Sequence, residues 1–356
     1  MKRIGGFCLA VIVILSLAPW IGAQKNSTPQ EDQPLILTTQ LPLPGVHGRF
    51  DHFAYGAAEQ GRNSVSAPSE IFISALGNNS VEVINLVEGT EVHRITGIPE
   101  PQGVTYAPGL NKLFVASRKG KLYIYDGTTY NPIGSIAYNA DVDNLRYDAA
   151  TKRVYVGYGD NDQAAIGMVD ATTNQRLREE YKTGAHPESF QLEQSGPNVY
   201  VNLPDLNQVG AIDRTTKTFS KWLLPDKIEE NFPMALDEAD HRLFIVTRTP
   251  PRLVVFDTNS GKVVATLPCV ADVDDLYYDA SYKRVYIPGG QGFIDVFEQK
   301  DVDHYERLAK VSSVIGARTA GYSGVKLGKK GRDRFFLAIP NTPGKQAAVW
   351  IYTAQE

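Results

Sequence analysis

The chain has 356 residues, of which 42% are hydrophobic and 21% charged, and its formal net charge is −4. This apolar fraction is ample for a packed core and excludes a disordered chain. The 31 Gly and 18 Tyr exclude a coiled coil, and only 2 Cys exclude a disulfide-stapled miniprotein. Length alone favours two domains, although a single all-β domain can reach this size.

The N-terminus has the pattern of a secretory signal. Lys2 and Arg3 form a basic start, residues 4–17 are apolar and uncharged, and Ala23 offers a small residue for cleavage. The alternative is a retained membrane anchor, but the apolar stretch is shorter than the ~20 residues of a bilayer span. We therefore expect a signal peptide at 1–23, a flexible polar leader at 24–34, and an exported, periplasmic or secreted protein with no membrane span after cleavage.

An internal repeat is the strongest signal in the sequence. Residues 141–156 (DVDNLRYDAATKRVYV) and 272–287 (DVDDLYYDASYKRVYI) are identical at eleven of sixteen positions, with an offset of 131 residues. That offset is three times about 44 residues, which is the length of a propeller blade. The repeat therefore predicts a unit of about 44 residues.

Each unit contains a triplet of β-branched or aromatic residues, followed by a polar loop and an alternating strand. The triplets occupy 71–73, 113–115, 154–156, 199–201, 243–245, 285–287 and 335–337. Alternation of period two with regular turn signals is typical of all-β folds, and four strands per unit indicate a propeller blade. The sequence thus predicts one seven-bladed β-propeller domain over residues 35–353.

The two ends of the predicted ring complement each other. The last unit ends at Tyr352 without a fourth strand, and an extra extended segment, LILTTQLPL (35–43), precedes the first triplet. We expect this segment to supply the outer strand of the last blade, which removes an open sheet edge.

The repeats resemble the YncE-like, YVTN-type β-propeller family. The motifs RVYVGYG (153–159) and NVYVNLP (198–204) carry the resemblance, which covers about residues 35–353. It implies an exported bacterial or archaeal propeller, in a family mostly without an established enzyme activity and with at least one member associated with single-stranded DNA. The motif is specific for fold and says little about function.

The repeated acidic residues at strand ends have a structural interpretation. Asp126, Asp170, Asp213 and Asp257 each end a strand before a tight turn, where an Asp side chain accepts hydrogen bonds from backbone N–H groups two residues on. We assign them to the scaffold.

Functional residues are expected where the chain enters each innermost strand and just after each triplet, because these loops meet around one mouth of the channel. The aligned entry positions are His52, Gly103, Asn144, Ser189, Met234, Asp275 and Ala320. The predicted ligand-binding residues of this face are Arg49, Asp51, Asp143, Asn144, Glu188, Asp274, Arg118 and Arg248. The alternative is a solvated polar lining of the channel, without a ligand.

The same face offers imidazole and carboxylate ligands for one divalent metal ion. His52, Glu188 and Asp275 are the predicted metal ligands. Such donors suit Zn, Cu, Fe or Mn, whereas carboxylate and amide oxygens alone suit Ca or Mg. No HExxH or CxxC spacing is present to strengthen this prediction.

Two classes of function remain open. A non-enzymatic, monomeric binding or scaffold module, holding a small molecule, peptide or protein at the channel face, is favoured because GxSxG, P-loop and CxxCH motifs are absent. The alternative is a divalent-metal-dependent lyase or lactonase with His186 as acid/base. Single-stranded nucleic acid is disfavoured by the acidic charge, and a haem- or quinone-associated role is a weaker third possibility.

Overall fold

The computed structural model describes residues 33–56, 69–327 and 332–355, and residues 33–356 form one compact unit. The predicted signal peptide lies outside the described residues, as does the leader up to residue 32.

The described residues form seven four-stranded antiparallel sheets, or blades, which confirms the predicted all-β propeller. The strands of the first four blades, from the inner strand outward, are β2 (Phe53–Tyr55), β3 (Glu70–Ala75), β4 (Ser80–Asn85) and β5 (Thr90–Thr96); β6 (Pro101–Ala107), β7 (Lys112–Ser117), β8 (Lys121–Asp126) and β9 (Pro132–Ala137); β10 (Val142–Asp148), β11 (Arg153–Tyr158), β12 (Ala165–Asp170) and β13 (Gln175–Lys182); and β14 (Phe190–Leu192), β15 (Asn198–Leu203), β16 (Gln208–Asp213) and β17 (Phe219–Leu223).

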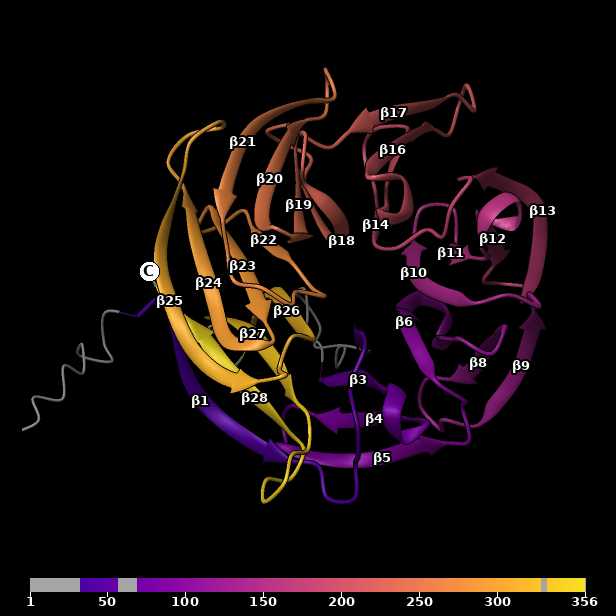
Figure 1. The fold of residues 1–356 in the computed structure, drawn as a ribbon. Helices are drawn as coiled ribbons and strands as arrows, with labels where there is room; N and C mark the ends of the chain where they lie inside the picture. The colour runs from indigo at the N-terminus through magenta and orange to yellow at the C-terminus, as the bar shows by residue number, and fades with distance from the viewer. Residues whose placement is uncertain (1–32, 57–68, 328–331, 356) are drawn as a thin grey trace, which may run out of the picture. The chain divides into compact units, whose positions relative to one another are not determined.

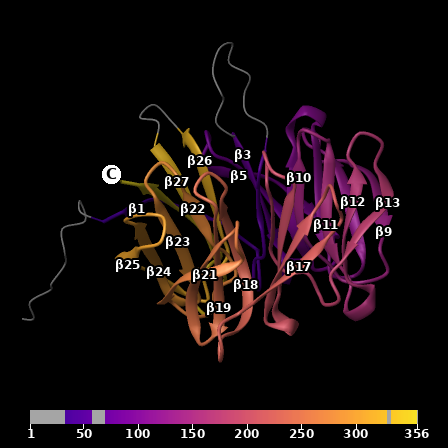
Figure 2. The ribbon, with the colours of Figure 1, turned by 90° about the horizontal axis from the view of Figure 1, so that it is seen from above.

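The remaining three blades continue the ring. Their strands are β18 (Glu229–Asp237), β19 (Arg242–Thr249), β20 (Pro251–Asp257) and β21 (Lys262–Pro268); β22 (Tyr277–Asp279), β23 (Arg284–Gly289), β24 (Gln291–Gln299) and β25 (Tyr305–Ile315); and β26 (Ala320–Leu327), β27 (Arg332–Ile339), β28 (Ala348–Ala354) and β1 (Leu35–Pro42). Short 3₁₀ turns follow the second strands of the first, third and fourth blades, at Leu76–Asn78, Asn161–Gln163 and Pro204–Leu206, and the first strand of the second blade, at Pro108–Leu110. Figure 1 shows the first strands of the blades around the centre and the fourth strands at the rim, and Figure 2 shows the blades edge-on.

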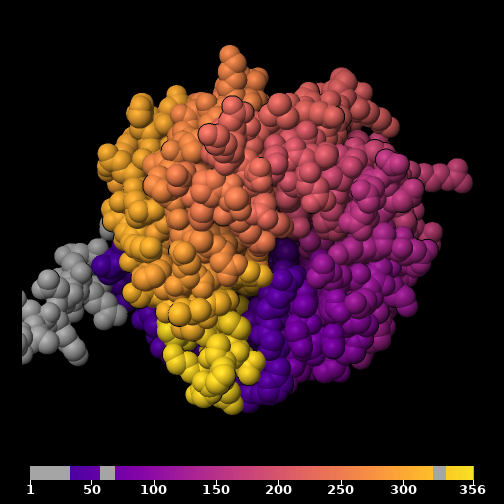
Figure 3. Space-filling model, viewed as in Figure 1, coloured from indigo at the N-terminus to yellow at the C-terminus, as the bar shows by residue number. Residues whose placement is uncertain are grey.

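The N-terminal strand closes the ring as predicted. Strand β1 pairs antiparallel with β28, in a register that runs from Leu35 opposite Ala354 to Pro42 opposite Ala348. Leu35 and Leu41 are only 2% and 6% exposed, so the strand contributes to the core as well as to the sheet. Figure 3 shows the indigo N-terminal residues packed directly against the yellow C-terminal ones.

The triplets build the core between blades. Their central residues are buried, with at most 2% exposure: Phe72, Phe114, Tyr155, Tyr200, Phe244, Tyr286 and Phe336. Several blades also present an inner-strand aromatic residue to their neighbour. The Phe244 ring stacks on Tyr278 of the next blade with centroids 5.0 Å apart. Aromatic contacts of this kind fix the angle between blades.

The strand-end aspartates have the predicted structural role. Asp126 Oδ1 accepts hydrogen bonds from the backbone N–H groups of Thr128 and Thr129, and Asp213 does the same for Thr215 and Thr216. Each carboxylate therefore closes the turn into the fourth strand of its blade.

The predicted repeat alignment is wrong by one residue in two blades. The third triplet residue pairs with Val104 in β6 and Leu145 in β10, but with Met234 in β18 and Ala320 in β26. β18 has a bulge before Met234, like the bulge of β10 before Leu145. Only the strand pairing beyond the bulge shows which residues of the two blades occupy equivalent positions. Pro233 and Thr319, rather than Met234 and Ala320, therefore occupy the place of Asn144.

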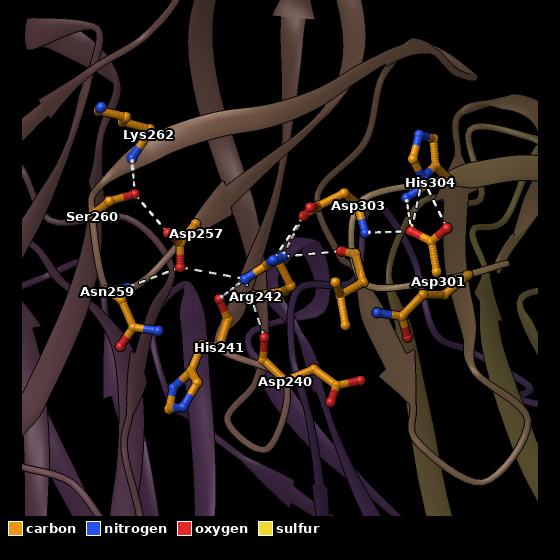
Figure 4. A network of polar contacts seen from close by, with 12 residues as sticks. Asp240, His241, Arg242, Asp257, Asn259, Ser260, Lys262, Asp301, Asp303 and His304 are labelled. Atoms are coloured by element: carbon orange, nitrogen blue, oxygen red, sulfur yellow. Dashed lines mark hydrogen bonds and ion pairs between the residues drawn. The ribbon is translucent and has the colours of Figure 1, made fainter.

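An arginine joins the fifth blade to the sixth. Arg242 in β19 contacts Asp257 of its own blade at 3.3 Å, and its Nη2 contacts Asp303, in the loop before β25, at 2.7 Å (Figure 4). The same guanidinium donates to the backbone carbonyl of Val302 at 3.0 Å. The loop of one blade is thus held by the strand of the preceding blade.

Candidate functional site

Two cavities lie along the inner strands. The first, here called the upper cavity, has a volume of about 330 Å³ and is lined by the loops that enter the inner strands and the loops that follow the triplets. The second, the lower chamber, has a volume of about 460 Å³ and is lined by the inner strands themselves. His52 and Ser189 line both. His52 Nε2 lies 3.1 Å from Asn144 Oδ1, two blades away, and Asn144 lines the upper cavity.

A glycine allows the inner strands of the second and third blades to lie close together. A Cβ on Gly103 in β6 would lie 2.2 Å from the Asp143 carbonyl oxygen, which is far inside van der Waals contact. The inner strands of the second and third blades can therefore approach closely only with glycine at this position. Asp143 and Asn144 are positioned by that packing.

Arginines at the upper cavity are matched with acids. Arg49 lies 3.6 Å from Asp51, and Arg118 lies 3.3 Å from Asp141. Asp274 receives two guanidinium groups, because Arg248 contacts one carboxylate oxygen and Arg318 lies 2.5 Å from the other. Each described arginine of the upper cavity thus has a carboxylate partner.

The centre of the upper cavity has carboxylates without an arginine partner. Asp143 is 8% exposed, and its Oδ1 is buried with no hydrogen-bond partner. Its Oδ2 lies 3.6 Å from His186 Nε2. Glu188 makes no ion pair with Lys or Arg among the described residues, although it lines the same cavity. Burying a carboxylate without a partner costs free energy of folding, so a bound cation or a proton would stabilise this centre.

Each histidine ring is held by one nitrogen, which leaves its other nitrogen toward Asp143 or Asp51. His186 Nδ1 lies 2.9 Å from the Gly159 carbonyl, which accepts a hydrogen bond and leaves Nε2 toward Asp143. His52 Nε2 is similarly engaged with Asn144, while its buried Nδ1 has no hydrogen-bond partner and lies 3.3 Å from Asp51. An oxygen acceptor on the outer nitrogen is the usual support of a metal-ligating histidine.

The acidic surroundings change the protonation of both rings. Burial opposes the charged form of His52, but the close contact with the Asp51 carboxylate, with the charges of Asp275 and Asp143, outweighs it and raises its pKa to about 10. Burial likewise opposes the charge on His186, yet Asp143 and Glu188 raise its pKa to about 10. Without a metal, the nearby carboxylates therefore keep both imidazole rings protonated at neutral pH.

The carboxylates respond to the same fields. Burial first, and then the charge of Asp143, raise the pKa of Glu188 to about 8. Burial also raises the pKa of Asp275 to about 7, against the opposing charge of His52. For Asp143, burial favours the neutral form, but the His186 hydrogen bond and the charge of His52 outweigh it and lower the pKa.

Two sets of donor atoms are close enough to hold an ion. Position A consists of Asp51, His52 and Asp143, and position B consists of Asp143, His186 and Glu188; in each, the donor atoms lie within 4.8 Å of one another. Asp143 belongs to both sets. It is therefore the central residue of the candidate metal site.

The structure gathers most of the predicted residues in one place. The eight predicted ligand-binding residues all line the upper cavity: Arg49, Asp51, Asp143, Asn144, Glu188, Asp274, Arg118 and Arg248. The predicted metal trio is not brought together as one cluster. His52 and Glu188 belong to different donor sets, and Asp275 lines the lower chamber, where its Oδ2 accepts from the Ala320 N–H at 2.7 Å.

Residues outside the prediction also line the upper cavity. Asp160 and Asp205 follow the triplets of the third and fourth blades, and Asp160 lies 3.4 Å from His186 Nδ1. Their place after a triplet was a usable signal, since Arg118 and Arg248 were predicted by the same reasoning.

The raised pKa values give stability a definite dependence on pH. In the unfolded chain a histidine titrates near ~6.5, so the contribution of His52 and His186 is complete below that pH and is lost as pH rises through about 10. Glu188 acts in the same direction. Above about pH 6.5, we expect the free energy of unfolding of the metal-free protein to fall by roughly 1.4 kcal/mol per pH unit for each proton that the folded chain binds and the unfolded chain does not. Thermal melts in EDTA measure it.

Two variants test whether His186 causes this pH dependence of stability. His186→Gln removes one retained proton and should flatten the dependence, whereas His47→Gln, at an exposed position outside both cavities, should leave it unchanged. A melting temperature that stays level or rises with pH in the metal-free protein would show that these rings are not protonated.

Comparisons with known proteins give distant relatives and a common fold. No protein-family model matches the chain. The uncharacterized protein YncE of Salmonella typhi is 27% identical over 156 residues, which cover 43% of this chain and 44% of that protein. YncE of Salmonella typhimurium is 26% identical over the same lengths. The matched region thus spans less than half of these curated relatives.

Solved propellers match a larger share of the chain. A chain of the mitotic checkpoint complex has a TM-score of 0.73 at 12% identity, covering 96% of this chain and 99% of its own. A chain of Kuenenia stuttgartiensis hydrazine synthase has a TM-score of 0.67 at 16% identity, covering 86% and 98%. At these identities the likeness shows the fold alone. No helix in the described part of the chain is long and apolar enough to cross a membrane.

Proposed function

We propose that this chain, a YncE-like seven-bladed propeller, is a binding module that holds a divalent transition-metal ion in its upper cavity. The propeller fold and the YncE relatives fit a binding or scaffold role. The observation that carries the proposal is Asp143, a buried carboxylate whose Oδ1 has no partner and which belongs to both donor sets.

Position B is the better of the two places for the ion. Its Glu188 faces no arginine among the described ion pairs, whereas Asp51 of position A is already paired with Arg49 at 3.6 Å. An ion at position B therefore neutralises two carboxylates that have no Lys or Arg partner among the described ion pairs. Position B also uses the free Nε2 of His186, with Gly159 supporting the other nitrogen.

The donor set selects the class of metal. One imidazole and two carboxylates suit Zn²⁺, Mn²⁺ or Fe²⁺, whereas Mg²⁺ and Ca²⁺ prefer oxygen ligands alone. Binding must displace protons from His186 and Glu188, so the affinity should rise with pH.

Calorimetric titration of EDTA-treated protein with Zn²⁺ tests the proposal. We expect one ion per chain and no measurable heat with Mg²⁺. Asp143→Asn and Glu188→Gln should each weaken binding by more than about 100-fold, since even supporting residues cost 10–100-fold. Asp205→Asn is the matched control, because it removes the same charge from the same cavity but lies outside both donor sets.

The variants also separate the two positions. Retained binding in His52→Gln together with loss in Glu188→Gln assigns the ion to position B, and the reverse pattern assigns it to position A. Zn²⁺ binding that survives Asp143→Asn would overturn the proposal, as would wild-type protein that binds no ion.

A metal-dependent lyase or lactonase is the second candidate, because a cavity of about 330 Å³ has room for a small substrate beside an ion. With the ion at position B, His186 is a ligand, so proton transfer would fall to His52 rather than to His186. Hydrolysis of a lactone panel by Zn²⁺-loaded protein, lost in Asp143→Asn and kept in Asp205→Asn, would support this candidate.

A further inference from the structure

The lower chamber contains an arginine without an acidic partner. Arg146 in β10 lines this chamber and makes no ion pair within 4.0 Å among the described residues. The arginines of the upper cavity, in contrast, are all paired with carboxylates. Burial lowers the pKa of Arg146, but a guanidinium remains charged in proteins. Its charge is therefore available to a ligand.

The hydrogen bonds of Arg146 leave part of its donor capacity open. Nη1 donates to the Leu145 carbonyl at 2.8 Å and to Asn144 Oδ1 at 3.5 Å, and Nη2 donates to Ser189 Oγ at 3.3 Å. These contacts hold the planar group in place and use three of its five N–H donors. The remaining donors suit a carboxylate, which arginine binds with defined geometry.

A carboxylate of opposite charge lines the same chamber. Asp275 has no Lys, Arg or His within 4.0 Å among the residues that the structure describes. One of its oxygens accepts from the Ala320 N–H at 2.7 Å, which fixes the side chain. The chamber thus presents one positive and one negative group, separated by more than an ion-pair distance.

The rest of the chamber fits a small molecule. Its volume of about 460 Å³ lies within the usual range of small-molecule pockets. Large polar and aromatic residues, including Gln191 and Tyr277, line it together with the small residues Ala54, Thr105 and Ala235. The buried hydroxyl of Tyr55, which also lines it, has no hydrogen-bond partner. This adds a third polar group that a ligand could satisfy.

We propose that the lower chamber binds a free α-amino acid in its zwitterionic form. The ligand carboxylate pairs with the Arg146 guanidinium, and the ligand ammonium group pairs with Asp275. Both unpaired charges are then neutralised by one molecule, while the apolar and aromatic wall contacts its side chain. Its two charged residues, Arg146 and Asp275, belong to neither metal donor set, so this proposal does not depend on the metal site.

Three related probes test both charged groups of the ligand. L-phenylalanine, N-acetyl-L-phenylalanine and L-phenylalanine amide are titrated calorimetrically into EDTA-treated protein, so that failure of the metal proposal leaves this test intact. We expect L-phenylalanine to bind and the other two to bind at least about tenfold more weakly, because each lacks one charge. Equal binding of the acetylated probe would overturn the proposal, as would no binding of L-phenylalanine.

Variants connect the binding to the two side chains. Arg146→Gln should abolish L-phenylalanine binding. Asp275→Asn should weaken it and reduce the preference over the acetylated probe, a signature that a merely structural role would not produce. Arg178→Gln, at an exposed position of β13 outside both cavities, is the control and should bind as the wild type does. Circular dichroism confirms folding, and Arg146→Lys replaces Arg146→Gln if the latter fails to fold. Unchanged binding in folded Arg146 and Asp275 variants would refute the assignment.

Discussion

Replacing the buried leucines of the closing strand should remove most of the stability of the propeller. We expect the double variant Leu35→Asp, Leu41→Asp to lose about 3–6 kcal/mol from apolar burial alone. A further loss comes from placing charges in the core. Total stabilities of domains are about 5–15 kcal/mol, so this is a large share. Denaturant unfolding, followed by circular dichroism, measures the change.

A variant of the same strand is the control for this experiment, and an added peptide should partly reverse the loss of stability. Gln40→Asp places a charge on the exposed face of the same strand and should change stability little. The double variant frees the edge of β28, so it should also self-associate in size-exclusion chromatography. A synthetic peptide of residues 33–43, added in excess, should restore part of its melting temperature. If the double variant melts like the wild type, β1 does not close the ring in solution.

Removing the arginine beside a buried glutamate should have the second large effect. Glu82 in the middle of β4 is 0% exposed, and Arg94 in β5 contacts it at 2.6 Å. Arg94→Met leaves that carboxylate buried and unpaired, which typically costs about 3–5 kcal/mol. Urea unfolding measures the loss, and the m-value should stay unchanged if only stability is altered.

Two comparisons separate the charge effect from lost packing. Adding Glu82→Gln to Arg94→Met should recover most of the stability, because the buried charge is gone. Lys182→Met breaks an exposed pair with Glu180 at 2.9 Å and should cost less than about 1 kcal/mol. A double variant as unstable as Arg94→Met alone would mean that the arginine acts by packing.

The repeat predicted the fold well because each blade carries its own pattern. The triplets, the strand-end aspartates and the extra segment at 35–43 are local signals, and each is found where it was expected. The lining of the upper cavity followed from the same alignment. Blade position determines which loops reach the channel mouth, and the repeat determines blade position.

The grouping of side chains inside the channel could not be predicted in this way. His52 meets Asn144 across 92 positions of sequence, and Gly103 controls how closely the inner strands of the second and third blades approach. Asp274 and Asp275 are neighbours in the loop before β22, yet they line different cavities. The strand position of buried Glu82 is Gly167, Gly210 or Val254 in other blades, so the repeat does not predict an acid there.

The pairing of β1 with β28 also sets an order of events during synthesis. The hydroxyl of Thr38 donates to the carbonyl of Ile351, 313 positions later, so this contact cannot form until almost the whole chain exists. Blades one to six are built from hairpins between neighbouring segments and can form as the chain emerges. Closing such a long loop is entropically costly and slow. The first strand made is therefore the last to pair, and the time it spends exposed is when the chain is most open to chaperones, proteases and pairing with a second copy.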